Sequence, residues 1–183
     1  MKSVMLSIRP KWCEKIVSGE KTIEVRKTKP KLETPFKCYI YCTSGRPDLN
    51  IPISPERLMQ DYLETGSMQS LNCPLGNSKV IGEFTCDRID RLAPANEPYG
   101  IYDIDDDYVL QTCLENGALW DYGHGTPLYG WHISNLRIYD QPRELSEFTG
   151  LRNTRFGAAP YDIKRPPQSW CYVEEWEEQN DAE

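Results

Sequence analysis

The sequence predicts an α+β fold, a small mixed β-barrel with helices packed on its outside. Within the first 27 residues the apolar positions switch from helical spacing to the alternation of a strand. Four later apolar runs have the length and composition of strands, and the predicted helices do not alternate regularly with them. At 183 residues, of which 39% are hydrophobic, the chain is long enough to bury one core. We therefore expect a single domain over residues 1–176, with five or six strands and two or three helices.

The first 27 residues predict a strand, a short helix and a second strand. Residues 3–9 are rich in apolar side chains, and Pro10 suits the first position of a helix. The apolar residues that follow at helical spacing are Trp12, Cys13, Ile16 and Val17. Gly19 is expected to end this helix, because glycine is common at helix C-termini. From residue 21 onward apolar residues alternate with polar ones, as in a strand. On this second strand Glu24 and Arg26 share a face, so they can pair with each other.

The middle of the chain predicts two strands separated by an insertion. Residues 36–43 are apolar on both faces, as in a central strand, and residues 78–90 form the next strand. Between them, residues 44–78 are an inserted segment of loops, in which Ser54-Pro55 opens a predicted helix. Loops of this length usually have a function or are mobile, so a protein-binding role for this insertion is one open hypothesis.

The last third predicts one helix, two strands and an acidic tail. Residues 103–115 form the helix, with Asp103 or Asp105 as its cap and Asn116-Gly117 as its end. Strands follow over residues 128–139 and 169–173, and residues 140–165 are expected to be irregular. Residues 177–183 are a short acidic tail, which we expect to be disordered.

Charge is distributed unevenly along the chain. The net charge is −7, yet residues 1–50 hold eleven Lys/Arg and five Asp/Glu, a local net charge of +6. A basic first third can present a positive surface to a nucleic acid although the whole chain is acidic. The alternative is an acidic domain with an uneven surface and no nucleic-acid partner.

Composition also limits the environment and the cofactors. No apolar run reaches transmembrane length and no signal peptide is readable, so we expect a cytoplasmic protein without a membrane partner. The odd number of cysteines, seven, and the absence of a C-x-x-C pair favour free, buried thiols. With only two histidines and no ligand spacing for zinc, the sequence predicts neither a metal nor a cofactor.

The strand, helix and second strand predicted within the first 27 residues resemble the signature of the ASCH family in the PUA-like superfamily. Its pattern reads Gly-x-Lys-x-x-Glu-x-Arg after a strand and a helix, and its defining positions are filled by Gly19, Lys21, Glu24 and Arg26. Residues 129–136 look like a late barrel strand of such proteins. The resemblance implies a PUA-like barrel.

The predicted binding site combines cations with aromatic rings. Phosphate contacts and base stacking require these groups, and single-stranded RNA or one everted nucleotide is the ligand that suits them. We therefore predict an RNA- or modified-nucleotide-binding protein. Its candidate ligand residues are Arg9, Lys11, Trp12, Lys21, Thr22, Glu24, Arg26, Trp131, Arg165 and Trp170. Two alternatives stay open: Glu24 and Arg26 form an exposed ion pair worth at most about 1 kcal/mol, and the aromatic residues of the later strands belong to the core.

The resemblance also implies two possible activities. Some members of the family are ribonucleases, and others remove the acetyl group from acetylcytidine with a motif resembling Gly-x-Lys-Thr-x-Thr-x-Arg. Lys21 and Thr22 match that motif, but Glu24 stands at the position of the second, catalytic threonine. A different hydrolysis stays open, with Glu24 as general base for water and Lys21 stabilising an oxyanion.

Overall fold

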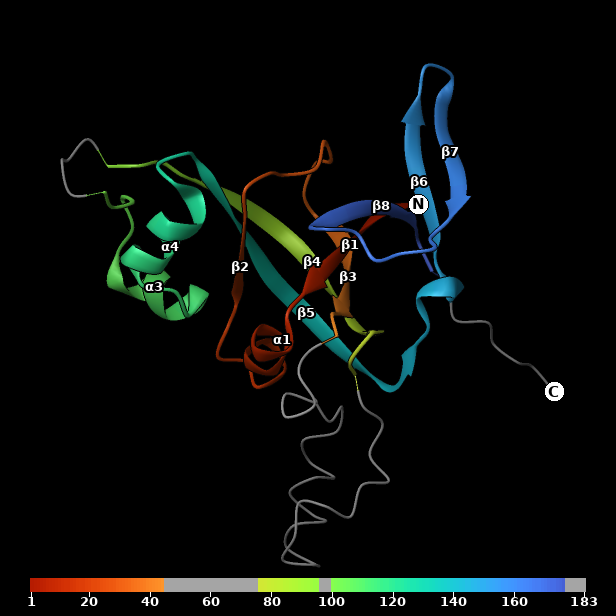
Figure 1. Cartoon of the computed structure of the whole chain (residues 1–183), viewed down its shortest axis with the longest axis horizontal. Helices are drawn as coiled ribbons and strands as arrows, with labels where there is room; N and C mark the ends of the chain where they lie inside the picture. Colours follow the sequence, from red (N-terminus) through yellow and green to blue (C-terminus); the bar gives the residue numbers. More distant parts are fainter. Residues whose placement is uncertain (45–75, 96–99, 177–183) are drawn as a thin grey trace, which may run out of the picture.

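Eight strands of the described chain form one mixed sheet, in the order β2-β5-β4-β3-β1-β8-β6-β7 (Figure 1). The computed structural model describes residues 1–44, 76–95 and 100–176. Its strands are β1 Lys2–Ile8, β2 Ile23–Arg26, β3 Phe36–Cys42, β4 Lys79–Leu92, β5 Leu128–Arg143, β6 Thr149–Thr154, β7 Gly157–Asp162 and β8 Trp170–Glu174. Its helices are α1 Pro10–Val17, α3 Asp106–Thr112, α4 Asn116–Gly123 and the 3-10 turn η2 Leu145–Glu147.

The sheet is mixed because β1 and β3 run parallel, whereas the other neighbouring strands are antiparallel. The predicted α+β class is therefore confirmed. The hydrogen-bonded order of the described strands starts at β2 and ends at β7, and no pairing between these two strands closes the sheet. Closure into a barrel is not confirmed and stays a prediction.

The first predicted unit is confirmed. The helix α1 begins at Pro10, as predicted, and buries Cys13 and Ile16 against the core. Gly19 follows its end with a φ of +77°, a conformation that glycine adopts without strain. β1 and β3 are buried along nearly their whole length, which agrees with the central position predicted for residues 36–43.

Two apolar clusters pack on opposite sides of the central strands. Alternate residues of β1 and β3 enter different clusters: Leu6 and Ile40 join one, while Met5 and Tyr39 join the other. Trp131 of β5 lies fully buried in the first cluster. A third cluster forms between β5 and the pair α3 and α4, which Figure 1 shows side by side at one end of the sheet.

The prediction that residues 140–165 are irregular is wrong. This segment contains the end of β5, the turn η2 and the hairpin β6–β7. The hairpin lacks the apolar alternation that predicts a strand, because residues 152–158 are all exposed. Backbone pairing and polar side-chain contacts, such as that of Lys2 Nζ with Asn153 Oδ1 at 2.8 Å, hold them. The number of strands, predicted as five or six, is correspondingly too low.

The prediction that Asn116-Gly117 ends a helix is also wrong, because α4 begins there. The Asn116 side chain accepts a hydrogen bond from the Tyr102 N–H at 2.6 Å and donates one to the Tyr102 carbonyl at 3.1 Å. It thereby ties α4 to the preceding loop. The cap of α3 is Asp105, one of the two predicted candidates, whose carboxylate accepts from the Tyr108 N–H at 2.8 Å.

The six cysteines of the described chain are free thiols, as predicted, and Cys13, Cys38, Cys42 and Cys86 are buried. Burial raises the pKa of Cys38, and raises that of Cys86 to about 12, so both thiols stay protonated at neutral pH. They act as small apolar residues of the core.

Some predictions lie outside the described residues. These are the helix predicted from Ser54-Pro55, nearly all of the insertion at 44–78, and the acidic tail at 177–183. Of the helices that the structure describes, none has both the length and the apolar character needed to cross a membrane.

Candidate functional site

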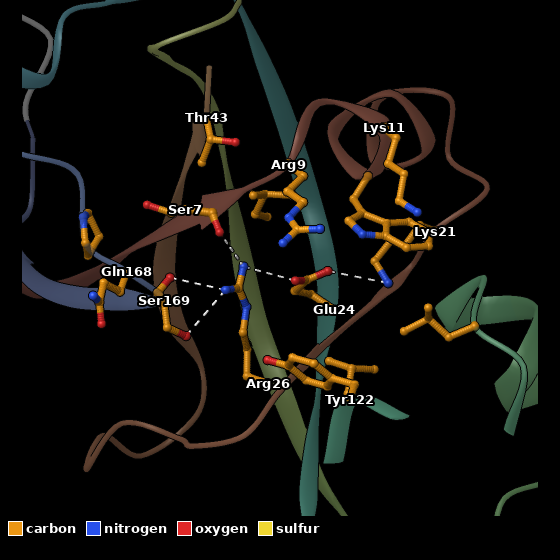
Figure 2. Close-up of a pocket in the computed structure, with 15 residues that line it drawn as sticks. Ser7, Arg9, Lys11, Lys21, Glu24, Arg26, Thr43, Tyr122, Gln168 and Ser169 are labelled. Carbon is orange, nitrogen blue, oxygen red and sulfur yellow. Dashed lines mark hydrogen bonds and ion pairs between the residues drawn. The ribbon is translucent and has the colours of Figure 1, made fainter. Parts of the chain in front are cut away.

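A cavity of about 570 Å³ opens where β1 ends and α1 begins. Figure 2 shows side chains from β1, α1, β2 and the segment before β8 converging on it. Its lining residues are Ser7, Ile8, Arg9, Lys11, Trp12, Lys21, Glu24, Val25, Arg26, Thr43, Leu114, Tyr122, Pro167, Gln168 and Ser169. Its size lies within the range of roughly 300–1,000 Å³ that is usual for small-molecule sites.

Lys21 lies at the floor of this cavity, where only 2% of the residue is exposed. Its Nζ donates to the carbonyl of Thr112 at 2.6 Å and lies 3.4 Å from Glu24 Oε2. Thr112 is the last residue of α3, where carbonyl groups are left without helical partners. The end of α3 therefore covers and holds the lysine.

Glu24 lies between two cations (Figure 2). Its Oε2 faces Lys21, and its Oε1 lies 3.0 Å from a terminal nitrogen of Arg26. The side chains of Glu24 and Arg26 are each 8% exposed, so the alternative of an exposed ion pair is wrong. Buried charges of this kind are tolerated only when paired and hydrogen-bonded.

Arg26 connects this charged cluster to the closing segment of the chain. Its guanidinium donates to the Ser7 carbonyl at 2.9 Å and to the Ser169 carbonyl at 3.2 Å. Ser7 is the penultimate residue of β1 and Ser169 precedes β8, so one side chain of β2 joins three segments that are far apart in the sequence. The position of Arg26 is therefore set by the tertiary structure.

Two buried polar atoms on the lining lack a hydrogen-bond partner within the described chain: Arg26 Nε and Ser7 Oγ. An unsatisfied buried donor costs about 1–3 kcal/mol, so native proteins rarely keep one without a reason. Both groups can donate a hydrogen bond. Both atoms are buried behind the lining, so they do not face an occupant of the cavity directly.

The rim adds charge and aromatic surface. Arg9 and Lys11 are exposed on the lining, and Lys11 Nζ lies 4.3 Å from the centre of the Trp12 ring. With Lys21, Glu24 and Arg26 included, the lining holds four cationic side chains and one anionic side chain, a net charge of +3. In a chain with a net charge of −7, this cavity is a local positive region suited to an anion.

Six of the ten predicted ligand residues meet at the cavity: Arg9, Lys11, Trp12, Lys21, Glu24 and Arg26. Thr22 does not line it, and its backbone instead bonds Gln111 and Ile133. Arg165 is exposed in the segment before β8, also outside the lining.

Trp131 and Trp170, the two predicted aromatic ligand residues outside α1, do not line the cavity. This agrees with the alternative that the aromatic residues of the later strands belong to the core. Trp131 is fully buried against Phe36, with ring centres 5.8 Å apart. Trp170 packs on Trp131 at 6.1 Å, and its Nε1 donates to Thr28 Oγ1 at 2.9 Å. Trp131 is thus a core residue, because β5 turns this side chain inward.

Sequence reasoning did not identify several lining residues. They are Ser7, Thr43, Leu114, Tyr122, Gln168 and Ser169. Ser7 lies two residues before Arg9, a predicted ligand residue, and this proximity in the sequence could have pointed to it. The other residues come from segments far from β2 in the sequence, and no local pattern shows that these segments lie close to β2 in the fold. In the parts of the chain that are described, no three His, Cys, Asp or Glu side chains gather as a metal site would require.

One family model matches part of the chain. Residues 6–44 match the model of the ASCH domain, a segment that includes Lys21, Glu24 and Arg26. The fold is similar to the crystal structure of ASCH from Zymomonas mobilis, with a TM-score of 0.50 and 18% identity over 94% of this chain and 88% of that chain. A mutant of the Zymomonas mobilis protein aligns with a TM-score of 0.50 and 18% identity, over 96% of this chain and 92% of that chain. No curated protein sequence matches.

Proposed function

Since the chain has the sequence signature and the fold of ASCH proteins, we propose that its cavity binds one nucleotide of a single-stranded RNA, or a modified nucleotide. The observation that supports this most directly is the charge of the cavity lining, where four cationic side chains and one anionic side chain give a net charge of +3. A phosphate group is an anion that such a lining favours.

The charge and the rings of the cavity support the same class of ligand. Arg9 and Lys11 are placed on the rim, where they can contact phosphates, and Trp12 supplies an aromatic face for a base. Glu24 contributes acceptor oxygens, because each carboxylate oxygen keeps a second lone pair after contacting its cation. A nucleotide has the matching acceptors, donors and π face.

The Arg9→Ala/Lys11→Ala variant tests the rim. We expect weaker binding of a fluorescein-labelled single-stranded RNA, measured by anisotropy between 50 and 200 mM salt. If each cation neutralises one phosphate, the slope of log K against log salt becomes shallower by about 1.4, since single strands contribute about 0.7 per phosphate. Arg91→Ala, which removes an exposed arginine outside the cavity lining, is the control and should bind like the wild type.

The outcome that contradicts the proposal is equally direct. Wild-type protein that binds neither RNA nor mononucleotides at 50 mM salt would exclude this function. An unchanged salt slope in the double variant would remove Arg9 and Lys11 from the phosphate contacts.

A second candidate, a hydrolase acting on RNA or a modified nucleoside, is favoured by one contact. Glu24 Oε2 lies 3.4 Å from Lys21 Nζ, and both side chains line the cavity. Glu24 would take a proton from water while Lys21 and Arg26 stabilise the negative charge that develops on the substrate oxygen.

The Glu24→Gln variant separates binding from turnover. The amide keeps the shape and an acceptor oxygen but cannot serve as a general base, so we expect turnover to fall by about 10²- to 10⁴-fold. The two substrates to test are single-stranded RNA and N-acetylated cytidine. Mass spectrometry of the recovered material detects cleavage of the RNA or loss of the acetyl group. Turnover equal to that of the wild type would exclude Glu24 as the base, and a thermal melt verifies that the variant is folded.

We assign this function to the cytoplasm, because free thiols are typical of a reducing compartment. The protein-interaction hypothesis for residues 44–78 concerns a segment almost wholly outside the described residues.

A further inference from the structure

We propose that the hairpin β6–β7 is a second contact for the RNA strand, outside the cavity. The inference rests on the proposed function, because it assumes that one nucleotide of that strand occupies the cavity. It assigns a role to a basic, aromatic surface that the cavity does not use.

The hairpin extends beyond the rest of the sheet (Figure 1). Of β6, Gly150 and Leu151 pair with β8, whereas the residues from Arg152 onward pair with β7 alone. Three further residues of strand form roughly 10 Å of two-stranded ribbon, at about 3.3 Å per residue. Residues 152–158 are exposed on this ribbon and therefore accessible to a partner.

An aromatic ring lies at the tip of the ribbon. Phe156 is 86% exposed, and the guanidinium of Arg155 lies 4.5 Å from the centre of its ring. The turn is held by Thr154, whose hydroxyl donates to the Gly157 carbonyl at 2.8 Å and accepts from the Phe156 N–H at 3.2 Å. An ordered tip presents the ring to a partner with little further loss of conformational freedom.

A single exposed phenylalanine is ordinary, so the surrounding charge decides the inference. Residues 149–169 contain Arg152, Arg155, Lys164 and Arg165 but only one acidic residue, a net charge of +3 in a chain of −7. Cations beside an exposed ring are the groups by which proteins bind a single strand without sequence preference. An acidic peptide would use the cations but has no base to stack on Phe156.

The chain itself connects this surface to the cavity. The segment after β7 carries the exposed residues Lys164 and Arg165 and then reaches Gln168 and Ser169 on the cavity lining. Arg165, which lies outside the cavity, therefore stands in the segment of chain that joins the hairpin to the site. In this proposal, a strand bound in the cavity continues along this segment to the hairpin.

The test compares two probes, uridine monophosphate and a twelve-nucleotide oligouridine, on one triple variant, Arg152→Gln/Arg155→Gln/Phe156→Ser. We expect affinity for the oligonucleotide to fall about 10- to 100-fold, as loss of one stacked base and two phosphate contacts implies. Affinity for the mononucleotide should not change. Arg91→Gln/Leu110→Ser is the matched control, since it also removes an exposed cation and an exposed apolar side chain.

The outcomes distinguish the two proposals. Unchanged oligonucleotide affinity in the triple variant, with mononucleotide binding retained, overturns the role of the hairpin and leaves the cavity function intact. Failure of the wild type to bind either probe overturns the proposed function and this inference together. Competition by polyglutamate as effective as that by the oligonucleotide overturns the assignment of the hairpin to RNA.

Discussion

The Lys21→Met variant is expected to lose about 3–5 kcal/mol of unfolding free energy, the usual cost of breaking a buried ion pair by removing one partner. Methionine fills a similar volume, so the loss comes from charge and hydrogen bonding. Glu24 would keep only Arg26 as a cationic partner, and the Thr112 carbonyl would lose the donor that lies 2.6 Å away. The same change should also weaken nucleotide binding, because Lys21 lines the cavity.

Urea unfolding followed by tryptophan fluorescence measures this loss, with the Lys21→Met/Glu24→Gln variant as its control. The double variant has no buried carboxylate left with one partner, so it should regain part of the stability while binding stays weak. A Lys21→Met protein as stable as the wild type would mean that the ammonium contributes no net stabilisation at the floor of the cavity.

The second large effect is expected at Trp131. Trp131→Ala should lower the unfolding free energy by about 3–5 kcal/mol, because it empties a fully buried position against Phe36 and Trp170. In a chain of this size the melting temperature should fall by roughly 6–20 °C. Trp131→Phe should cost less, since an aromatic ring remains and Trp131 Nε1 has no hydrogen-bond partner to lose among the residues that the structure describes.

Trp12→Ala provides the contrast in the same melting and anisotropy experiments. Trp12 is only partly buried and lines the cavity, so its removal should mainly reduce affinity for RNA. A Trp131→Ala protein that keeps its melting temperature but loses RNA binding would restore the ligand role predicted for Trp131 from the sequence.

The two tryptophans show why the binding site could be predicted only in part. Both are aromatic residues near a predicted strand or helix, and their residue type favours either a core or a stacking role. Sequence spacing gives the face of a strand, but it does not say what covers that face. Whether a ring is buried depends on distant segments, such as Trp170 on β8 against Trp131 on β5.

The hairpin β6–β7 was missed for a related reason. Local patterns predict strands whose one face is apolar, whereas this ribbon is exposed on both sides. Its strands exist because they pair with each other and because β6 joins β8 at two positions. Backbone pairing of exposed strands leaves no periodic trace in the side chains.

The sequence by itself determined the α+β class, the unit β1–α1–β2 and the motif that supplies Lys21, Glu24 and Arg26. Pro10, Gly19 and a change of apolar spacing act within a few residues, so their effect is readable locally. Only the tertiary structure decided that the three charges are buried, since Thr112 reaches Lys21 across 91 positions and Ser169 reaches Arg26 across 143. Burial makes this ion-pair cluster energetically important. In water an exposed ion pair contributes little, whereas a buried charge or donor that loses its partner costs several kcal/mol of unfolding free energy, at about 3–5 kcal/mol for a broken buried pair.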